Sequence, residues 1–210
     1  MSRNLKVTGV ALVAATAFMA LTAAGASAVE FHKTNMGNTV YSGSQVTQNV
    51  FTVPEGSLRC STVTLSAETV ETTTNALTFN PTYAGCEFGA LGKNSATVTM
   101  GNCDYVIAAN GLMDILCSSG NMVIDVAVAG VKKCTITIPP QINIGNIAYT
   151  NNADNTVTFS FNLANMFYET TTGSGAGACT ATTLRQGATY TGTVKVAGTI
   201  MGVAERIWVA

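Results

Sequence analysis

Six cysteines are the residues of this chain whose type and number suggest chemistry most directly. Zinc sites prefer closely spaced ligand pairs such as C-x2-C, or nearby histidines. No C-x2-C spacing occurs, and the one histidine, His32, lies near the N-terminal end of the chain. An even number of cysteines in a chain with an export signal instead predicts disulfide bonds. These cysteines are Cys60, Cys86, Cys103, Cys117, Cys134 and Cys179.

The cysteine spacing suggests, but does not select, a pairing. Six cysteines allow 15 pairings. Cys86 and Cys103 are 17 positions apart, and so are Cys117 and Cys134. A glycine, Gly89 or Gly120, follows the first cysteine of each pair by three positions. We expect two similar loops and a third bond between distant parts. The expected pairs are Cys86–Cys103, Cys117–Cys134 and Cys60–Cys179.

A rival pairing joins Cys103 to Cys117. These cysteines flank Asn110-Gly111, a strong signal for a hairpin turn. A two-residue loop would place the two cysteines on opposite faces of the hairpin, whereas a three-residue loop would place them directly opposite each other.

Few other residues suggest catalysis. A Ser-His-Asp or Cys-His site needs a histidine held by the fold, and His32 lies four residues past the expected signal cleavage point. Two carboxylates could hydrolyse a glycoside. Asp104, Asp114 and Asp125 lie in or beside expected strands, where we interpret them as exposed strand and turn acids. The sequence therefore predicts neither a catalytic residue nor an enzyme.

Three further patterns invite a binding interpretation. The run Asn151–Asn155 has oxygen ligands suited to calcium but lacks the acid count of an EF-hand, so a turn is expected. The loop Gly173–Ala178 has no lysine of the kind that a phosphate loop needs, so a surface loop is expected. Aromatic residues could form a sugar-stacking surface, although they more often fill a core. These aromatics are Tyr83, Phe88, Tyr105, Tyr149, Phe167, Tyr168, Tyr190 and Trp208. We therefore predict no metal and no bound cofactor.

The elements that position these residues are predicted to be strands. Polar and apolar residues alternate along much of the chain, and turn-forming residues separate the alternating runs every 8–12 residues or so. Pro139-Pro140 should end a strand, because proline cannot donate to the ladder. The clearest runs are Ser95–Met100, Thr135–Ile138, Thr156–Phe161 and Thr193–Val196, with Leu58–Leu65 and Met122–Val128 less regular.

This pattern predicts an all-β, antiparallel β-sandwich, Ig-like or jelly-roll-like, stapled by disulfides. An outer-membrane-type β-barrel is the alternative. The expected strands look shorter than the roughly 9–11 residues of a membrane-spanning strand, and the single tryptophan gives no aromatic girdle.

The N-terminus reads as a signal peptide, residues 1–28. Arg3 and Lys6 precede the uncharged run Val7–Ala24, and Ala26-Ser27-Ala28 fits a peptidase site. Cleavage leaves eight basic and eleven acidic residues, a formal charge of −3. We expect residues 29–50 to form a loosely attached arm and 51–210 to form one domain. Because no basic face is evident, we expect no nucleic-acid partner, and no second apolar run predicts a helical membrane anchor in the mature chain.

Several short motifs resemble a group of exported, six-cysteine all-β proteins of actinobacteria. They are YAGCEFGALGKNSATVTMGNCDY, LRCSTVTL, MDILCSSGN, KCTITIP, GACT and YTGTVKVAG, which together cover most of Cys60 to Gly198. The group has no established function. The resemblance therefore implies export and a cysteine-stapled β fold, and it implies no functional residue.

Taken together, these patterns predict a secreted or cell-surface β-domain with a non-catalytic role, structural or binding. Its expected partner is an extracellular ligand, an envelope component or copies of itself. A glycan hydrolase that uses a carboxylate pair is the alternative from another class.

Overall fold

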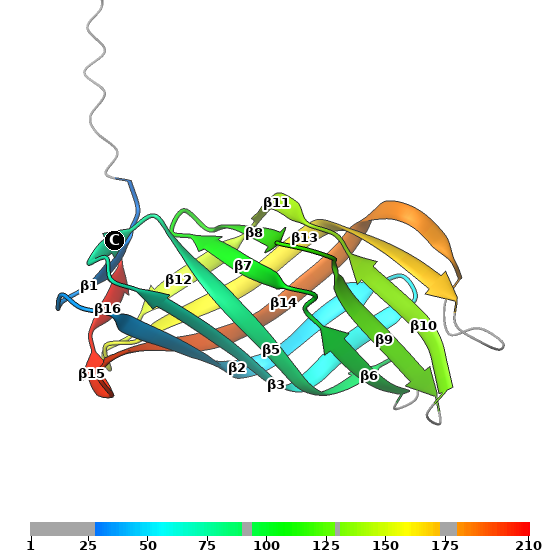
Figure 1. Cartoon of the computed structure of the whole chain (residues 1–210), viewed down its shortest axis with the longest axis horizontal. Helices are drawn as coiled ribbons and strands as arrows, with labels where there is room; N and C mark the ends of the chain where they lie inside the picture. The colour runs from blue at the N-terminus through cyan, green and yellow to red at the C-terminus, as the bar shows by residue number, and fades with distance from the viewer. Residues whose placement is uncertain (1–27, 90–93, 129–130, 173–179) are drawn as a thin grey trace, which may run out of the picture.

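A computed structural model describes residues 28–89, 94–128, 131–172 and 180–210. These residues form sixteen β-strands and no helix, which confirms the predicted all-β class (Figure 1). The expected signal peptide, Ala28 apart, and the expected surface loop Gly173–Ala178 lie outside the described residues.

The strands range from two to nineteen residues in length. They are β1 (Phe31–Lys33), β2 (Thr39–Val53), β3 (Gly56–Thr69), β4 (Thr73–Thr74), β5 (Ala76–Phe88), β6 (Asn94–Thr99), β7 (Cys103–Ala108), β8 (Leu112–Cys117), β9 (Met122–Val128), β10 (Val131–Ile138), β11 (Gln141–Gly145), β12 (Ile147–Asn151), β13 (Val157–Thr172), β14 (Thr182–Ile200), β15 (Val203–Glu205) and β16 (Ile207–Val209).

Eight antiparallel strands close into a barrel in the order β14-β2-β3-β5-β6-β9-β10-β13, and β13 pairs again with β14. The predicted β-sandwich is therefore wrong in its topology, because the strands form a closed ring and not two stacked sheets. The prediction failed because alternation is the same in a sandwich and in a barrel.

The barrel wall divides at β5. The end of β5, Cys86–Phe88, pairs with β6, whereas its start, Ala76–Phe79, pairs with β7. Strands β7, β8 and β11 continue the wall from there, so β11 comes to lie beside β13. No backbone ladder joins β11 to β13 among the pairings of the described strands. This gap in the ladder is referred to below as the seam.

The barrel interior is apolar and its outer surface is polar. In β13, for example, Val157, Phe159, Phe161 and Leu163 are buried, and the residues between them face outward. An eight-stranded barrel has an interior just wide enough for side chains to fill. The predicted alternation thus places the core inside the barrel.

A small sheet of order β16-β1-β4 covers one end of the barrel, which we call the capped end (Figure 1). Phe31 of β1 is buried there and meets the rings of Tyr149 and Phe159. Backbone hydrogen bonds join Glu30 to Ala210, so the two ends of the described chain meet at the capped end. Residues 29–50 were expected to form a loosely attached arm, but they hold β1 of the capping sheet and most of β2 of the barrel wall.

Candidate functional site

The cysteines form staples across neighbouring strands, but not in the expected pairs. Cys60 of β3 is bonded to Cys86 of β5, and Cys103 of β7 is bonded to Cys117 of β8. Cys134 is also in a disulfide, and Cys179 lies outside the described residues. The expected pairs Cys86–Cys103, Cys117–Cys134 and Cys60–Cys179 are therefore wrong, because strand register decided the pairing and sequence spacing did not.

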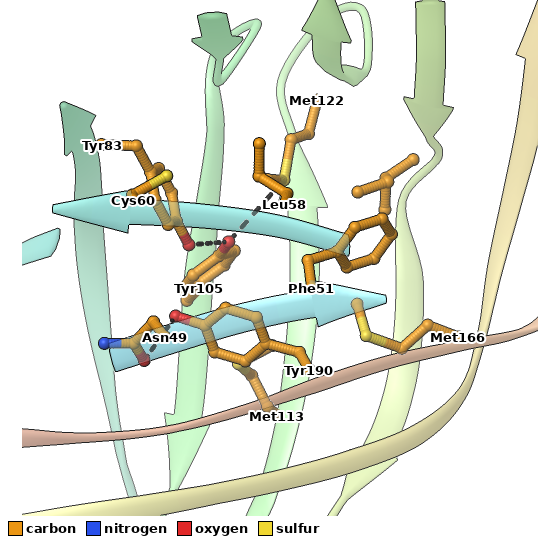
Figure 2. A pocket seen from close by; sticks show the side chains of 11 residues that line it. Asn49, Phe51, Leu58, Cys60, Tyr83, Tyr105, Met113, Met122, Met166 and Tyr190 are labelled. Atoms are coloured by element: carbon orange, nitrogen blue, oxygen red, sulfur yellow. Dashed lines mark hydrogen bonds between the residues drawn. The ribbon is translucent and has the colours of Figure 1, made fainter. Parts of the chain in front are cut away.

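Polar side chains meet inside the barrel beside the first disulfide (Figure 2). The hydroxyls of Tyr83 and Tyr105 are 2.6 Å apart, and the Tyr105 hydroxyl also lies 3.7 Å from the sulfur of Met122. The Tyr190 hydroxyl donates to Oδ1 of Asn49 at 2.9 Å. A buried polar group is costly unless it is hydrogen-bonded, and each of these tyrosines has a partner.

Burial keeps these tyrosines protonated. Loss of water raises the pKa of Tyr105 to about 12, although its hydrogen bond with Tyr83 acts in the opposite direction. Burial, with a contribution from neighbouring Tyr105, raises the pKa of Tyr83 well above its ordinary value. Burial also raises the pKa of Tyr190. None of the three is therefore suited to act as a base near neutral pH.

The space between these side chains is small. The cavity has a volume of about 20 Å³, and it is also lined by Met113 and Met166. That volume suffices for one water molecule and not for an organic ligand. We interpret the interior cluster as a satisfied polar core.

A larger hollow lies on the outside, along the seam. It encloses about 580 Å³ between Pro140–Gly145 on one side and Ala164, Asn165, Phe167 and Gln186 on the other, and we call it the seam groove. Ligand pockets commonly have volumes of about 300–1,000 Å³. The seam groove is therefore large enough for part of a small molecule or a short polymer.

The side chain of Gln141 bridges the seam in place of a backbone ladder. Its Oε1 accepts from the Phe167 backbone N–H at 2.9 Å, and its Nε2 donates to the Phe167 carbonyl at 3.2 Å. On the β8 side, Asp114 accepts from the Asn143 backbone N–H at 2.7 Å. These bonds hold β11 in place and leave an open groove beside it.

The seam groove combines amides with an aromatic ring and contains no charged side chain among its described lining residues. Asn143 and Asn165 both have positive φ, 56° and 58°, a conformation that asparagine tolerates better than most residues. The Phe167 side chain is 41% exposed, and Gln186 lies opposite it in the β13–β14 ladder. This lining suits an uncharged ligand that carries hydroxyl groups and an apolar face.

The acids singled out in the sequence are dispersed. Asp104 accepts from the side chain of Asn80 at 3.1 Å, and Asp125 accepts from the Thr135 hydroxyl at 2.9 Å. Asp104 and Glu68 together line a shallow hollow on the outer wall. Glu68 is exposed, so its carboxylate lies in water and not in an enclosed site.

The run Asn151–Asn155 forms the expected turn between β12 and β13. Asp154 forms an ion pair with Lys195. Hydrogen bonds from Lys195 and Thr156 lower the pKa of the Asp154 carboxyl to about 2. Within the described parts of the chain, no group of three His, Cys, Asp or Glu side chains is placed to hold a metal.

Most of the aromatic residues weighed as a sugar-stacking surface fill the barrel. Tyr105, Tyr168 and Tyr190 are buried, as is Phe88, whereas Phe167 reaches the seam groove. Tyr83, Tyr149 and Trp208 are half-buried, and the ring of Trp208 stacks on His32 with 5.2 Å between the ring centres. Sequence analysis did not predict a role for Gln141, Asn143 or Asn165. The nearest sequence feature that it used was Pro139-Pro140, which was predicted to end a strand just before Gln141.

No protein-family model and no curated protein matches the chain. A likeness was found to the solved structure of the enduracididine biosynthesis enzyme MppR complexed with the condensation product of pyruvate and imidazole 4-carboxaldehyde. It covers 79% of this chain and 90% of that chain, with 8% sequence identity and a TM-score of 0.22. A score this low carries no argument about fold or function.

Among the described residues, no helix has the length and apolar character needed to cross a membrane.

Proposed function

We propose that this protein is an exported, non-catalytic binding domain that holds a neutral carbohydrate in the seam groove. The observation that carries the proposal is the lining of that groove: exposed Phe167 lies among the side chains of Asn143, Asn165 and Gln186, without a charge. An aromatic face packs against the apolar face of a sugar, and amides donate to and accept from its hydroxyls.

The fold supports a binding role because the groove lies on a rigid wall. Strands β13 and β14 pair along most of their length, and Gln141 holds β11 against them. A site on a rigid scaffold binds without a large ordering cost. The disulfides are compatible with a protein that works outside the cell.

The hydrolase alternative has one observation in its favour, the shared hollow of Glu68 and Asp104. That hollow is shallow and lies on the outer wall, so it offers little exclusion of water around a reacting bond.

The outer-membrane alternative was set aside partly because the strands looked short, and that reason was wrong, since β14 has nineteen residues. The outward side chains of the barrel are largely polar, whereas a membrane barrel presents an apolar outer band.

Calorimetric titration of the exported protein with neutral gluco-, manno- and galacto-oligosaccharides tests the proposal. Phe167→Ala should weaken binding about tenfold or more, because it removes the stacking surface. Asn165→Gly should also weaken binding, and glycine keeps the positive φ at that position. The matched control is Leu116→Ala, since Leu116 is 44% exposed and does not line the seam groove.

Binding that is unchanged in both Phe167→Ala and Asn165→Gly would refute the seam groove as the site. Cleavage of an oligosaccharide that is abolished by Glu68→Gln or Asp104→Asn would replace the proposal by the hydrolase alternative.

A further inference from the structure

Turns at the capped end carry apolar side chains that project into solvent. Met201, in the turn between β14 and β15, is 99% exposed, and Met36, between β1 and β2, is 88% exposed. Val70, between β3 and β4, and Val203 of β15 are also exposed. Single exposed apolar residues are ordinary, but several gathered at one end of a barrel need an explanation.

Hydrogen bonds show that these turns share one end. Lys33 of β1 donates from Nζ to the carbonyls of Gly37 and Thr69, which connects the turns that hold Met36 and Val70. Asn35 donates from its backbone and from its side chain to Glu205, the last residue of β15. Figure 1 shows β1, β15 and β16 together at this end of the barrel.

Met201 adopts a backbone conformation that does not suit methionine. Its φ is 50°, and the other described non-glycine residues with positive φ are all asparagines: Asn102, Asn143, Asn155 and Asn165. Asparagine and glycine are the ordinary choices for such a turn. Local geometry therefore does not explain the methionine, and its side chain has no packing role because it is almost wholly exposed.

The same end holds the single tryptophan of the chain. Trp208 lies in β16, on the half-exposed outer side of the capping sheet, with the guanidinium of Arg206 5.2 Å from its ring centre. Tryptophan and arginine are suited to the headgroup layer of a lipid surface, where one part of the side chain is apolar and the other is hydrated.

A lipid surface fits these projections better than a second copy of the chain does. A stable protein interface buries about 800 Å² on each side, whereas these exposed side chains stand on separate turns and on the short strand β15. Exposed Glu68 and Glu71 lie nearby, so the surface in question is a neutral one and not an anionic one.

We propose that the capped end docks on a neutral lipid surface by inserting Met36 and Met201 at the level of the acyl boundary, with Trp208 and Arg206 among the headgroups. Such docking is peripheral, since the side chains enter the interface and the strands do not cross it. The site is separate from the seam groove, so either proposal can fail without the other.

Phosphatidylcholine vesicles and the exported protein test this docking, and Trp208 serves as a built-in fluorescent probe. Vesicles should shift the Trp208 emission to shorter wavelength and should carry the protein down on sedimentation. Met201→Asn should weaken partitioning about tenfold, because it removes one inserted apolar side chain. It should not lower folding stability, because asparagine suits the positive φ.

Met36→Ser combined with Met201→Asn should reduce partitioning to background. The matched control is Ile142→Ser, which alters an exposed apolar residue in the seam groove and should leave partitioning unchanged. The proposal is overturned if the unaltered protein does not bind phosphatidylcholine vesicles, or if binding requires added anionic lipid. It is equally overturned if sedimentation shows self-association that Met201→Asn abolishes, since a second copy would then cover this end.

Discussion

Cys103 and Cys117 lie directly opposite each other in the β7–β8 hairpin and are joined by a disulfide. Residues 109–111 form a three-residue loop between the two strands, and Gly111 has a φ of 88°. A two-residue loop would have moved Cys117 to the other face of its strand. One residue of loop length therefore decides which cysteine Cys103 meets.

Peptide mapping of the unreduced exported protein should recover Cys60 linked to Cys86 and Cys103 linked to Cys117. Replacing Cys103 and Cys117 together by serine should lower the free energy of unfolding by about 3 kcal/mol, because the unfolded chain loses a constraint on its entropy. Urea unfolding measures the change. Recovery of a Cys86–Cys103 peptide would contradict the registers of β3 with β5 and of β7 with β8.

Alternation was enough to predict strands but not their extent. The run Thr156–Phe161 predicted part of β13, yet that strand continues to Thr172 through Asn165, where φ is 58° and the register with β14 shifts. Such bulges break the period of two, so long strands looked short in the sequence. Closure of the barrel depends on pairings between strands far apart in sequence, and no local pattern reveals them.

The seam groove was less predictable than the fold. Phe167 was one of eight aromatics considered, and nothing in its neighbourhood marked it as the one on the groove. The role of Gln141 depends on two hydrogen bonds to Phe167 across 26 positions. The three acids were predicted correctly in place but not in exposure, because Asp104, Asp114 and Asp125 lie in strands yet are half-buried and hydrogen-bonded.

Removal of the hydroxyl group from two buried tyrosines should have different effects on the free energy of unfolding. Tyr105→Phe should lower the free energy of unfolding by about 1–2 kcal/mol, because it removes the bond to Tyr83. Tyr168 is fully buried, and its hydroxyl has no hydrogen-bond partner among the described residues. Tyr168→Phe should therefore be neutral or stabilising by up to about 1 kcal/mol. Urea unfolding compares the pair, and equal losses would argue against the assigned bonds.

Alkaline pH should destabilise the barrel between about pH 10 and pH 12. Burial raises the pKa of both Tyr41 and Tyr105 to about 12 in the folded protein, whereas the ordinary tyrosine value is about 10. When the pKa of a group is higher in the folded than in the unfolded protein, the group's contribution to the free energy of unfolding is complete at pH values below the pKa of the unfolded state. That contribution is lost as the pH rises through the pKa of the folded state. Unfolding free energies from pH 8 to pH 12 should fall over this window, and less steeply in Tyr105→Phe. A flat profile would mean that these hydroxyls ionise freely.

Glu205 should make the capped end sensitive to acid. Burial alone would raise the pKa of this carboxyl, but hydrogen bonds from the side chain and backbone of Asn35, with help from Lys33, together lower it below its ordinary value. Since the folded pKa lies below the unfolded one, its contribution is complete above the unfolded value near 4.5 and is lost as pH falls through the folded value. Glu205→Gln should therefore reduce stability at pH 7 and weaken the loss on acidification, as measured by urea unfolding from pH 7 to pH 3. Asn35→Ala should also reduce stability at pH 7, because two charge-assisted bonds become one. If both variants lose stability in parallel with the unaltered protein as the pH falls, another carboxyl governs the acid response.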